Sequence, residues 1–151
     1  MLDPPQILDV AAQPTAVIHL TLGWPQMQQK MGPAMQEVIA AVTGQNATVT
    51  GAMFSFHFRR PTDTLDFEVG LPVASAVTAV GRVKPSTLPA LRVLRTVYHG
   101  PYEGLGDAWG QFIAWAAEHG HTVQPSLWEC YTVGPQHSAN AADWCTELSL
   151  P

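Results

Sequence analysis

Charged residues are scarce in this 151-residue chain: they make up 13% of it, whereas hydrophobic residues make up 46%. Only seven residues are lysine or arginine, and the formal net charge is −5. A protein that binds nucleic acid directly needs a basic cluster to neutralise a run of phosphates. Because the basic residues here are few and scattered, we expect no direct nucleic-acid binding. The apolar content favours a folded globular domain over a disordered tail.

Neither a long apolar run nor the pattern of a signal peptide is visible in the sequence. No stretch approaches the roughly 18 consecutive apolar residues of a membrane span. Residues 1–13 carry two aspartates and two prolines in place of the basic and apolar segments of a signal peptide. Two cysteines, Cys130 and Cys145, are too few for a disulfide-stabilised secreted domain. We therefore expect a cytoplasmic protein without membrane contact, in which both cysteines are small buried side chains.

Motifs for cofactors and metals are absent from the sequence as well. There is no phosphate-binding loop, dinucleotide fingerprint or nucleophile elbow. The closest pair of histidines, His119 and His121, flanks Gly120 at the end of a predicted helix. That spacing is typical of a helix C-cap and not of a pair of metal ligands. We expect neither a cofactor nor a metal.

The chain contains an internal repeat, with half-repeats at about 14–73 and 88–151. In the first half, β-forming residues predict a strand at 16–22. Apolar residues at helical spacing then predict a helix with its apolar face between Met27 and Val42. Gly32-Pro33 implies either a kink or a helix that begins there. The other predicted strands of this half are 51–59 and 66–73.

The second half follows the same scheme. It predicts a strand at 91–98, a helix over 105–116, and strands at 127–133 and 143–150. The connector, residues 74–89, offers one further strand at 79–83. Together the halves predict an α+β fold of duplicated β-α-β-β units with pseudo-two-fold symmetry. We expect one domain over 1–151, with antiparallel strands forming a central groove and helices packed on the outer face.

The strand at 127–133 is the most informative segment for function. Because side chains alternate along a strand, Trp128 and Cys130 share one face, while Glu129 and Tyr131 share the other. The apolar pair suits a core covered by the helices, which places the carboxyl and the phenol on the opposite face. If that face is solvated, Glu129 and Glu147 of the last strand are ordinary surface charges.

The functional alternative is a carboxylate in an aromatic groove. A partly desolvated glutamate is unfavourable unless a cation pairs with it, and aromatic rings add cation–π attraction. Desolvation also raises a carboxyl pKa, which suits a general base. Phe54 and Phe56 share a strand face, and Tyr102 precedes the second helix, so these rings could form the opposite wall. An aromatic stripe of this kind is also typical of plain core.

Several motifs, taken in order, resemble those of the GyrI-like effector-binding family. The second half carries YHGPYEGL at 98–105, WGQFIAW at 109–115, WECY at 128–131 and a final TELSLP. In the first half, MGPAMQEVIAAV at 31–42 and EVGLPV at 68–73 are similar too. The resemblance extends over nearly the whole chain.

This resemblance implies a duplicated β-α-β-β fold around a ligand groove. The central glutamate of the family falls on Glu129, and further pocket residues fall on Tyr131 and Glu147. Family members include effector domains fused to DNA-binding modules, free-standing multidrug binders, gyrase inhibitors and hydrolases of cyclopropane-bearing genotoxic compounds. The residues before Ala16 leave no room for a helix-turn-helix, so we expect a stand-alone domain.

Three functions remain open from the sequence. The first is a binder of lipophilic, often cationic or aromatic, small molecules, acting in sequestration or sensing, with Glu129, Tyr131, Tyr102, Phe54, Phe56 and Glu147 as ligand-binding residues. The second is a hydrolase in which Glu129 activates water against a strained electrophilic ring and either Tyr131 or Tyr102 donates a hydrogen bond to the leaving oxygen. The third is a protein-binding module of the gyrase-inhibitor type.

Overall fold

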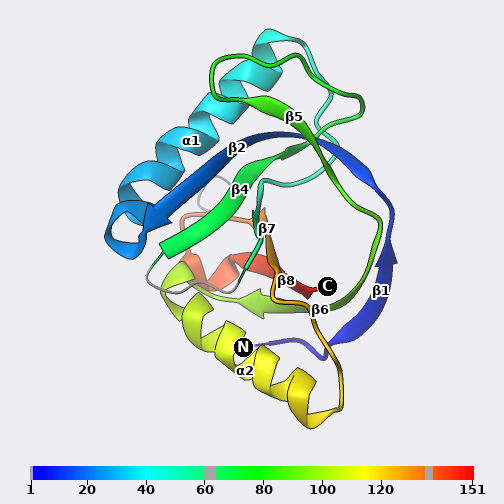
Figure 1. Cartoon of the computed structure of the whole chain (residues 1–151). Helices are drawn as coiled ribbons and strands as arrows, with labels where there is room; N and C mark the ends of the chain where they lie inside the picture. Colours follow the sequence, from blue (N-terminus) through cyan, green and yellow to red (C-terminus); the bar gives the residue numbers. More distant parts are fainter. Residues whose placement is uncertain (1, 60–63, 135–137) are drawn as a thin grey trace.

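The computed structural model describes residues 2–59, 64–134 and 138–151, which form an eight-stranded antiparallel sheet and two long helices (Figure 1). The sheet has the order β1-β6-β8-β7-β3-β4-β2-β5 and is strongly curled. The strands are β1 Gln6–Val10, β2 Gln13–Gly23, β3 Phe54–His57, β4 Thr64–Pro72, β5 Lys84–Leu88, β6 Leu91–His99, β7 Leu127–Val133 and β8 Cys145–Leu150. The helices are α1 Trp24–Gly44 and α2 Leu105–Glu118, and the short 3-10 helices are η1 Tyr102–Gly104 and η2 Ala141–Asp143.

The predicted duplication is confirmed, with one unexpected strand, β1, in the first half and the connector strand at another position. The element order is β1-β2-α1-β3-β4 followed by β5-β6-α2-β7-β8. The halves join at the centre of the sheet, where β3 pairs with β7. The strand predicted at 79–83 is wrong: Val80 and Val83 form only an isolated bridge, and the strand lies at Lys84–Leu88. Pro85 is tolerated there because β5 is an edge strand.

The two leading strands pair across the halves. β1 pairs with β6 of the second half, and β5 pairs with β2 of the first half. Only residues 11–12 separate β1 from β2, and only residues 89–90 separate β5 from β6. Both links cross on the same side of the molecule, opposite the helices (Figure 1). Each edge strand is therefore joined by a short link to a strand of its own half while it pairs with a strand of the other half.

Helix α1 is longer than its apolar pattern predicted. It begins at Trp24, with Pro25 in its first turn, and continues through Pro33 to Gly44. The alternative of a helix that begins at Gly32-Pro33 is therefore wrong. Proline fits the first turn because the N–H groups there have no partner within the helix. In the part of the chain described, no helix has the length and apolarity needed to cross a membrane.

Each helix covers its own half of one sheet face. Helix α1 buries Ala34 and Val38 against Ile18 of β2 and Phe67 of β4. Helix α2 buries Phe112 against a similar set from β6, β7 and β8: Leu94, Leu127, Leu148 and Leu150. Figure 1 shows the helices on the same side of the curled sheet, one over each half. The middle of the sheet, at β3 and β7, therefore faces the gap between α1 and α2.

The face assignment predicted for β7 is wrong. Trp128 packs with Phe54 and Phe56 in a core cluster that includes neither helix, and Cys130 lies against the same cluster. Leu127 and Tyr131 belong to the two helix-covered clusters. Glu129, which alternates with Trp128 and Cys130, therefore lies on the helix-covered face. The prediction had placed it on the opposite one.

Gly70 of β4 leaves no room for a side chain. A Cβ at this residue would lie 2.2 Å from the carbonyl oxygen of Ala16 and 2.7 Å from Cγ1 of Val17. We expect Gly70→Ala to lower the free energy of unfolding by about 3 kcal/mol, because a β2 backbone atom must shift. Gly110→Ala in α2 is the matched control, since nothing lies within 4 Å of its Cβ. Gly110→Ala should raise the free energy of unfolding, measured with urea, by about 1 kcal/mol. If the two variants changed it equally, the predicted clash at Gly70 would be contradicted.

Candidate ligand-binding site

The carboxyl of Glu129 is the centre of the site. It projects from β7 on the helix-covered face and is only 8% exposed. Burial raises its pKa to about 7, and hydrogen bonding with Trp109 of α2 and Tyr131 of β7 lowers the pKa by a smaller amount. Among the described residues, Oε2 of this carboxyl has no hydrogen-bond partner. A carboxyl in this state is half ionised near neutral pH and has an unused acceptor.

A chain of polar side chains continues from Glu129 across β3. Ser55 lies directly opposite Glu129 in the β3–β7 pair, and its Oγ is 2.9 Å from Oη of Tyr131 and 3.4 Å from Nε2 of His57. All three groups are buried. The imidazole stacks on Phe67 with ring centroids 4.8 Å apart. Burial lowers the pKa of His57 to about 4, so at neutral pH this histidine is uncharged.

Aromatic rings enclose the other side of the carboxyl. Tyr102 of η1 lies edge-on to Tyr131, with centroids 5.8 Å apart, and 4.8 Å from the Trp144 ring. Partial burial and the negative charge of Glu129 raise the pKa of Tyr102. The pKa of Tyr131 is raised for the same two reasons, burial first. Both phenols are therefore neutral hydrogen-bond donors at neutral pH, next to the buried carboxyl of Glu129.

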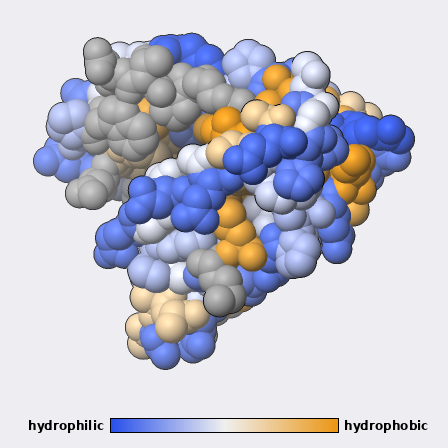
Figure 2. Space-filling model, turned by 90° about the horizontal axis from the view of Figure 1, so that it is seen from below, coloured by the Kyte–Doolittle hydropathy of each residue, from blue (hydrophilic) through white to orange (hydrophobic). Residues whose placement is uncertain are grey.

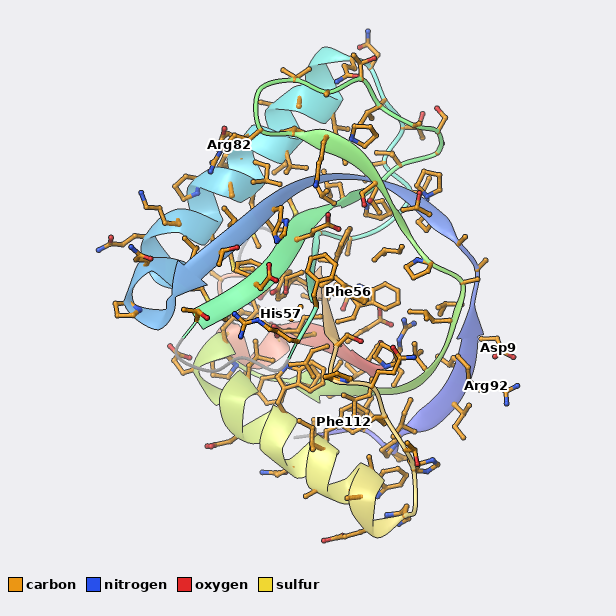
Figure 3. All side chains as sticks on the ribbon, viewed as in Figure 1. Asp9, Phe56, His57, Arg82, Arg92 and Phe112 are labelled. Atoms are coloured by element: carbon orange, nitrogen blue, oxygen red, sulfur yellow. The ribbon has the colours of Figure 1, made fainter. Side chains whose placement is uncertain are left out.

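The structure brings together three of the six predicted ligand-binding residues: Glu129, Tyr131 and Tyr102. Phe54, Phe56 and Glu147 lie on the opposite face, because they pair in register with Cys130, Trp128 and Cys130 respectively. Figure 3 shows Phe56 and His57, neighbours in β3, pointing to opposite sides of the sheet. On that far face Glu147 lies 3.8 Å from Arg95, whose guanidinium stands over the Trp128 ring.

Ser55, His57 and Trp109 are site residues that the sequence prediction missed. Alternation along β3 offered a signal for two of them, since Ser55 and His57 must face away from Phe54 and Phe56. No comparable signal existed for Trp109, because its apolar neighbours in α2 mark it equally well as core. The arrangement can hold a cation against the carboxylate or, when Glu129 is protonated, present a buried hydrogen-bond donor.

Comparison with known proteins agrees with this architecture. Residues 3–151 match the family described as the GyrI-like small molecule binding domain, and the chain belongs to that family. No curated protein sequence matches it.

Solved structures share the fold at low sequence identity. The C-terminal domain of EcmrR has a TM-score of 0.85 and 17% identity, covering 98% of this chain and 96% of that one. In the EcmrR–DNA complex the TM-score is 0.83 and the identity 21%, and the chain spans 56% of EcmrR. SAV2435 bound to tetraphenylphosphonium has a TM-score of 0.70 and 11% identity, covering 99% and 93%. A hydrolase from Listeria innocua has a TM-score of 0.63 and 13% identity, covering 97% and 90%.

Proposed function

We propose that this protein binds lipophilic cationic or aromatic small molecules at Glu129, as a multidrug sensing or sequestration domain. The observation that carries the proposal is a buried carboxyl with an unpartnered oxygen, surrounded by Tyr102, Tyr131 and Trp109. The structural similarity to SAV2435, solved with the lipophilic cation tetraphenylphosphonium, supports the same class of ligand.

Electrostatics favour a cation in this position. An ionised carboxyl without a counter-charge is strongly disfavoured in an apolar interior, and the raised pKa of Glu129 reflects that penalty. A ligand cation removes the penalty and also attracts the electron-rich faces of the neighbouring rings. A lipophilic cation gains further, because its apolar surface forms no hydrogen bonds with water that binding would break.

A ligand needs space beside the carboxyl, and Glu129 is only 8% exposed. Trp109 from α2 hydrogen-bonds to the carboxyl, and Tyr102 from η1 lies close enough for the charge of Glu129 to raise its pKa. Tyr102 is only partly buried and lies between Gly100, at φ 138°, and Gly104. We infer that displacement of the Tyr102 side chain opens the route to Glu129.

Calorimetric titration with tetraphenylphosphonium at pH 8 tests the proposal. We expect Glu129→Gln to weaken binding at least tenfold, in the range found when one partner of a buried charge pair is removed. Glu147→Gln is the matched control on the opposite face and should leave the affinity within about twofold. A ligand at a hundred times its Kd should also add about 2.7 kcal/mol of stability. Binding lost in Glu147→Gln and kept in Glu129→Gln would move the site to the other face.

A second candidate is hydrolysis of strained electrophilic rings in the same pocket. A carboxyl with a pKa of about 7 is suited to accept a proton from water at neutral pH, and Tyr131 could donate a hydrogen bond to the leaving oxygen. The similarity to a Listeria innocua hydrolase supports this alternative. It requires that Glu129→Gln abolish turnover while the affinity for a neutral substrate is kept.

A protein-binding role of the gyrase-inhibitor type gains less support. Figure 2 shows a mainly hydrophilic face in which apolar atoms form small separate patches. The exposed large hydrophobic residues of the described chain lie on different segments: Ile7, Ile39, Val49, Phe58 and Val80. A docking surface for a protein partner is usually a contiguous apolar patch.

A further inference from the structure

A second cluster of interacting side chains, made of Cys145, His99 and Asp3, lies outside the Glu129 site. His99 ends β6 directly opposite Cys145, which begins β8. Sγ of Cys145 is 3.4 Å from Nδ1 of His99, and Nε2 of the same ring is 3.0 Å from Oδ1 of Asp3. These two contacts put a thiol, a base and an orienting carboxylate in the order used by nucleophilic sites.

The carboxylate selects the ring tautomer that the thiol needs. Because a carboxylate accepts hydrogen bonds, the Nε2–H of His99 donates to Asp3. In the neutral ring this leaves Nδ1 without a proton, facing Sγ of Cys145, where it can accept the thiol proton. Asp3 is itself held in place: its N–H donates to the carbonyl of Val97, and Oγ1 of Thr96 donates to the carbonyl of Asp3.

The cluster is accessible from solvent. The side chains of His99 and Asp3 are 41% and 48% exposed, and Cys145 is partly exposed. This corrects the expectation that both cysteines are buried. Cys130 is also partly exposed, but it packs beside Phe54 and Trp128. Burial, with a smaller contribution from Glu147, raises the pKa of the Cys130 thiol to about 12. Cys130 therefore serves as an internal control with low reactivity.

We propose that Cys145, His99 and Asp3 form a second site, one that reacts covalently with soft electrophiles such as activated alkenes. In the step, Sγ bonds to the terminal carbon of the alkene as its π bond breaks. The thiol proton passes to Nδ1 of His99 and from there to the α-carbon, so the ring ends neutral as it began. No other reactant is required. None of these three residues belongs to the Glu129 site.

Acrylamide labelling of the full chain at pH 7, followed by mass spectrometry of each cysteine peptide, tests the proposal. We expect Cys145 to react about tenfold faster in the folded protein than in the urea-unfolded chain, because a positioned base assists the thiol. Cys130 should react more slowly folded than unfolded. His99→Gln should reduce the Cys145 rate to that of the unfolded chain, and Asp3→Asn should reduce it about threefold.

Two outcomes would overturn the proposal: a Cys145 rate in the folded protein no higher than in the unfolded chain, or full enhancement retained in His99→Gln. Thermal unfolding of each variant shows whether it is folded, and the folded Cys130 rate reports local opening in the same experiment. If His99→Gln does not fold, Asp3→Asn decides, and an unchanged Cys145 rate in that variant overturns the proposal equally.

Discussion

Replacing Glu129 with glutamine is expected to stabilise the protein at pH 8 by about 3 kcal/mol, which follows from a carboxyl pKa raised from 4.5 to about 7. Most substitutions of a buried residue destabilise a fold. Here the opposite sign is expected because the wild-type fold must hold an ionised carboxyl without a counter-charge. Glutamine has nearly the same shape and never ionises.

The pH dependence of this stability difference follows from the different pKa values of Glu129 in the folded and the unfolded chain. Below about pH 4.5 the carboxyl is protonated in both the folded and the unfolded chain, so the two proteins should be similarly stable. Between pH 4.5 and 7 the unfolded chain ionises at Glu129 while the folded chain does not, and wild-type stability falls. Above pH 7 the folded carboxyl is ionised too, and the difference reaches its limit.

Thermal unfolding of wild type and Glu129→Gln at pH 5 and pH 8 measures this effect. The difference in stability should grow by about 2.5 kcal/mol between the two pH values, or roughly 5–10 °C in Tm for a chain of this size. The pKa of His57 is lowered to about 4, but this contribution is common to both proteins and cancels in the comparison. A difference that does not change with pH would show that Glu129 titrates normally in the fold.

Affinity for tetraphenylphosphonium is expected to fall about a hundredfold from pH 8 to pH 5. Only the ionised carboxylate pairs with the cation, and with a pKa of about 7 about 1% of Glu129 is ionised at pH 5. The other titratable groups at the site stay neutral across this range, because the pKa of Tyr102 and of Tyr131 is raised and that of His57 is about 4.

The same coupling predicts proton release. At pH 6 about nine-tenths of Glu129 is protonated, so each bound cation should displace close to one proton. Titrations in buffers of different ionisation enthalpy count those protons. Glu129→Gln, as the control, should bind weakly at every pH and release none. A wild-type affinity that is constant from pH 5 to pH 8 would mean that the cation does not pair with Glu129.

The sequence predicted much of the fold because its repeated pattern is strong. Six of the eight strands and both helices were predicted near their observed positions. β1 and β5 were missed or misplaced because they are short edge strands containing polar residues or proline, and their partners lie far away in the sequence. Pairing of that kind leaves little trace in local propensity.

The site was predicted only in part because both faces of β7 are buried. Alternation correctly separated Glu129 and Tyr131 from Trp128 and Cys130, but the apolar content could not tell which face the helices cover. The helix-covered face includes Leu127 and Tyr131, whereas the other includes Trp128 and Phe56. The register of β3 against β7 then decides that Ser55 joins the glutamate and that Phe54 and Phe56 do not.

Because β1 pairs with β6 and β5 pairs with β2, each half contributes one edge strand to the other half's part of the sheet. If the chain were cut between the halves, each fragment would hold a strand of the other, an arrangement similar to that of a domain-swapped dimer. Neither half keeps all its strand partners on its own, so the two halves should unfold in one transition. Glu129 lies where β3 pairs with β7. On the opposite face of the sheet, Val10 of β1 and Leu88 of β5 pack in the same cluster as Trp128, so the two exchanged strands also stabilise this junction.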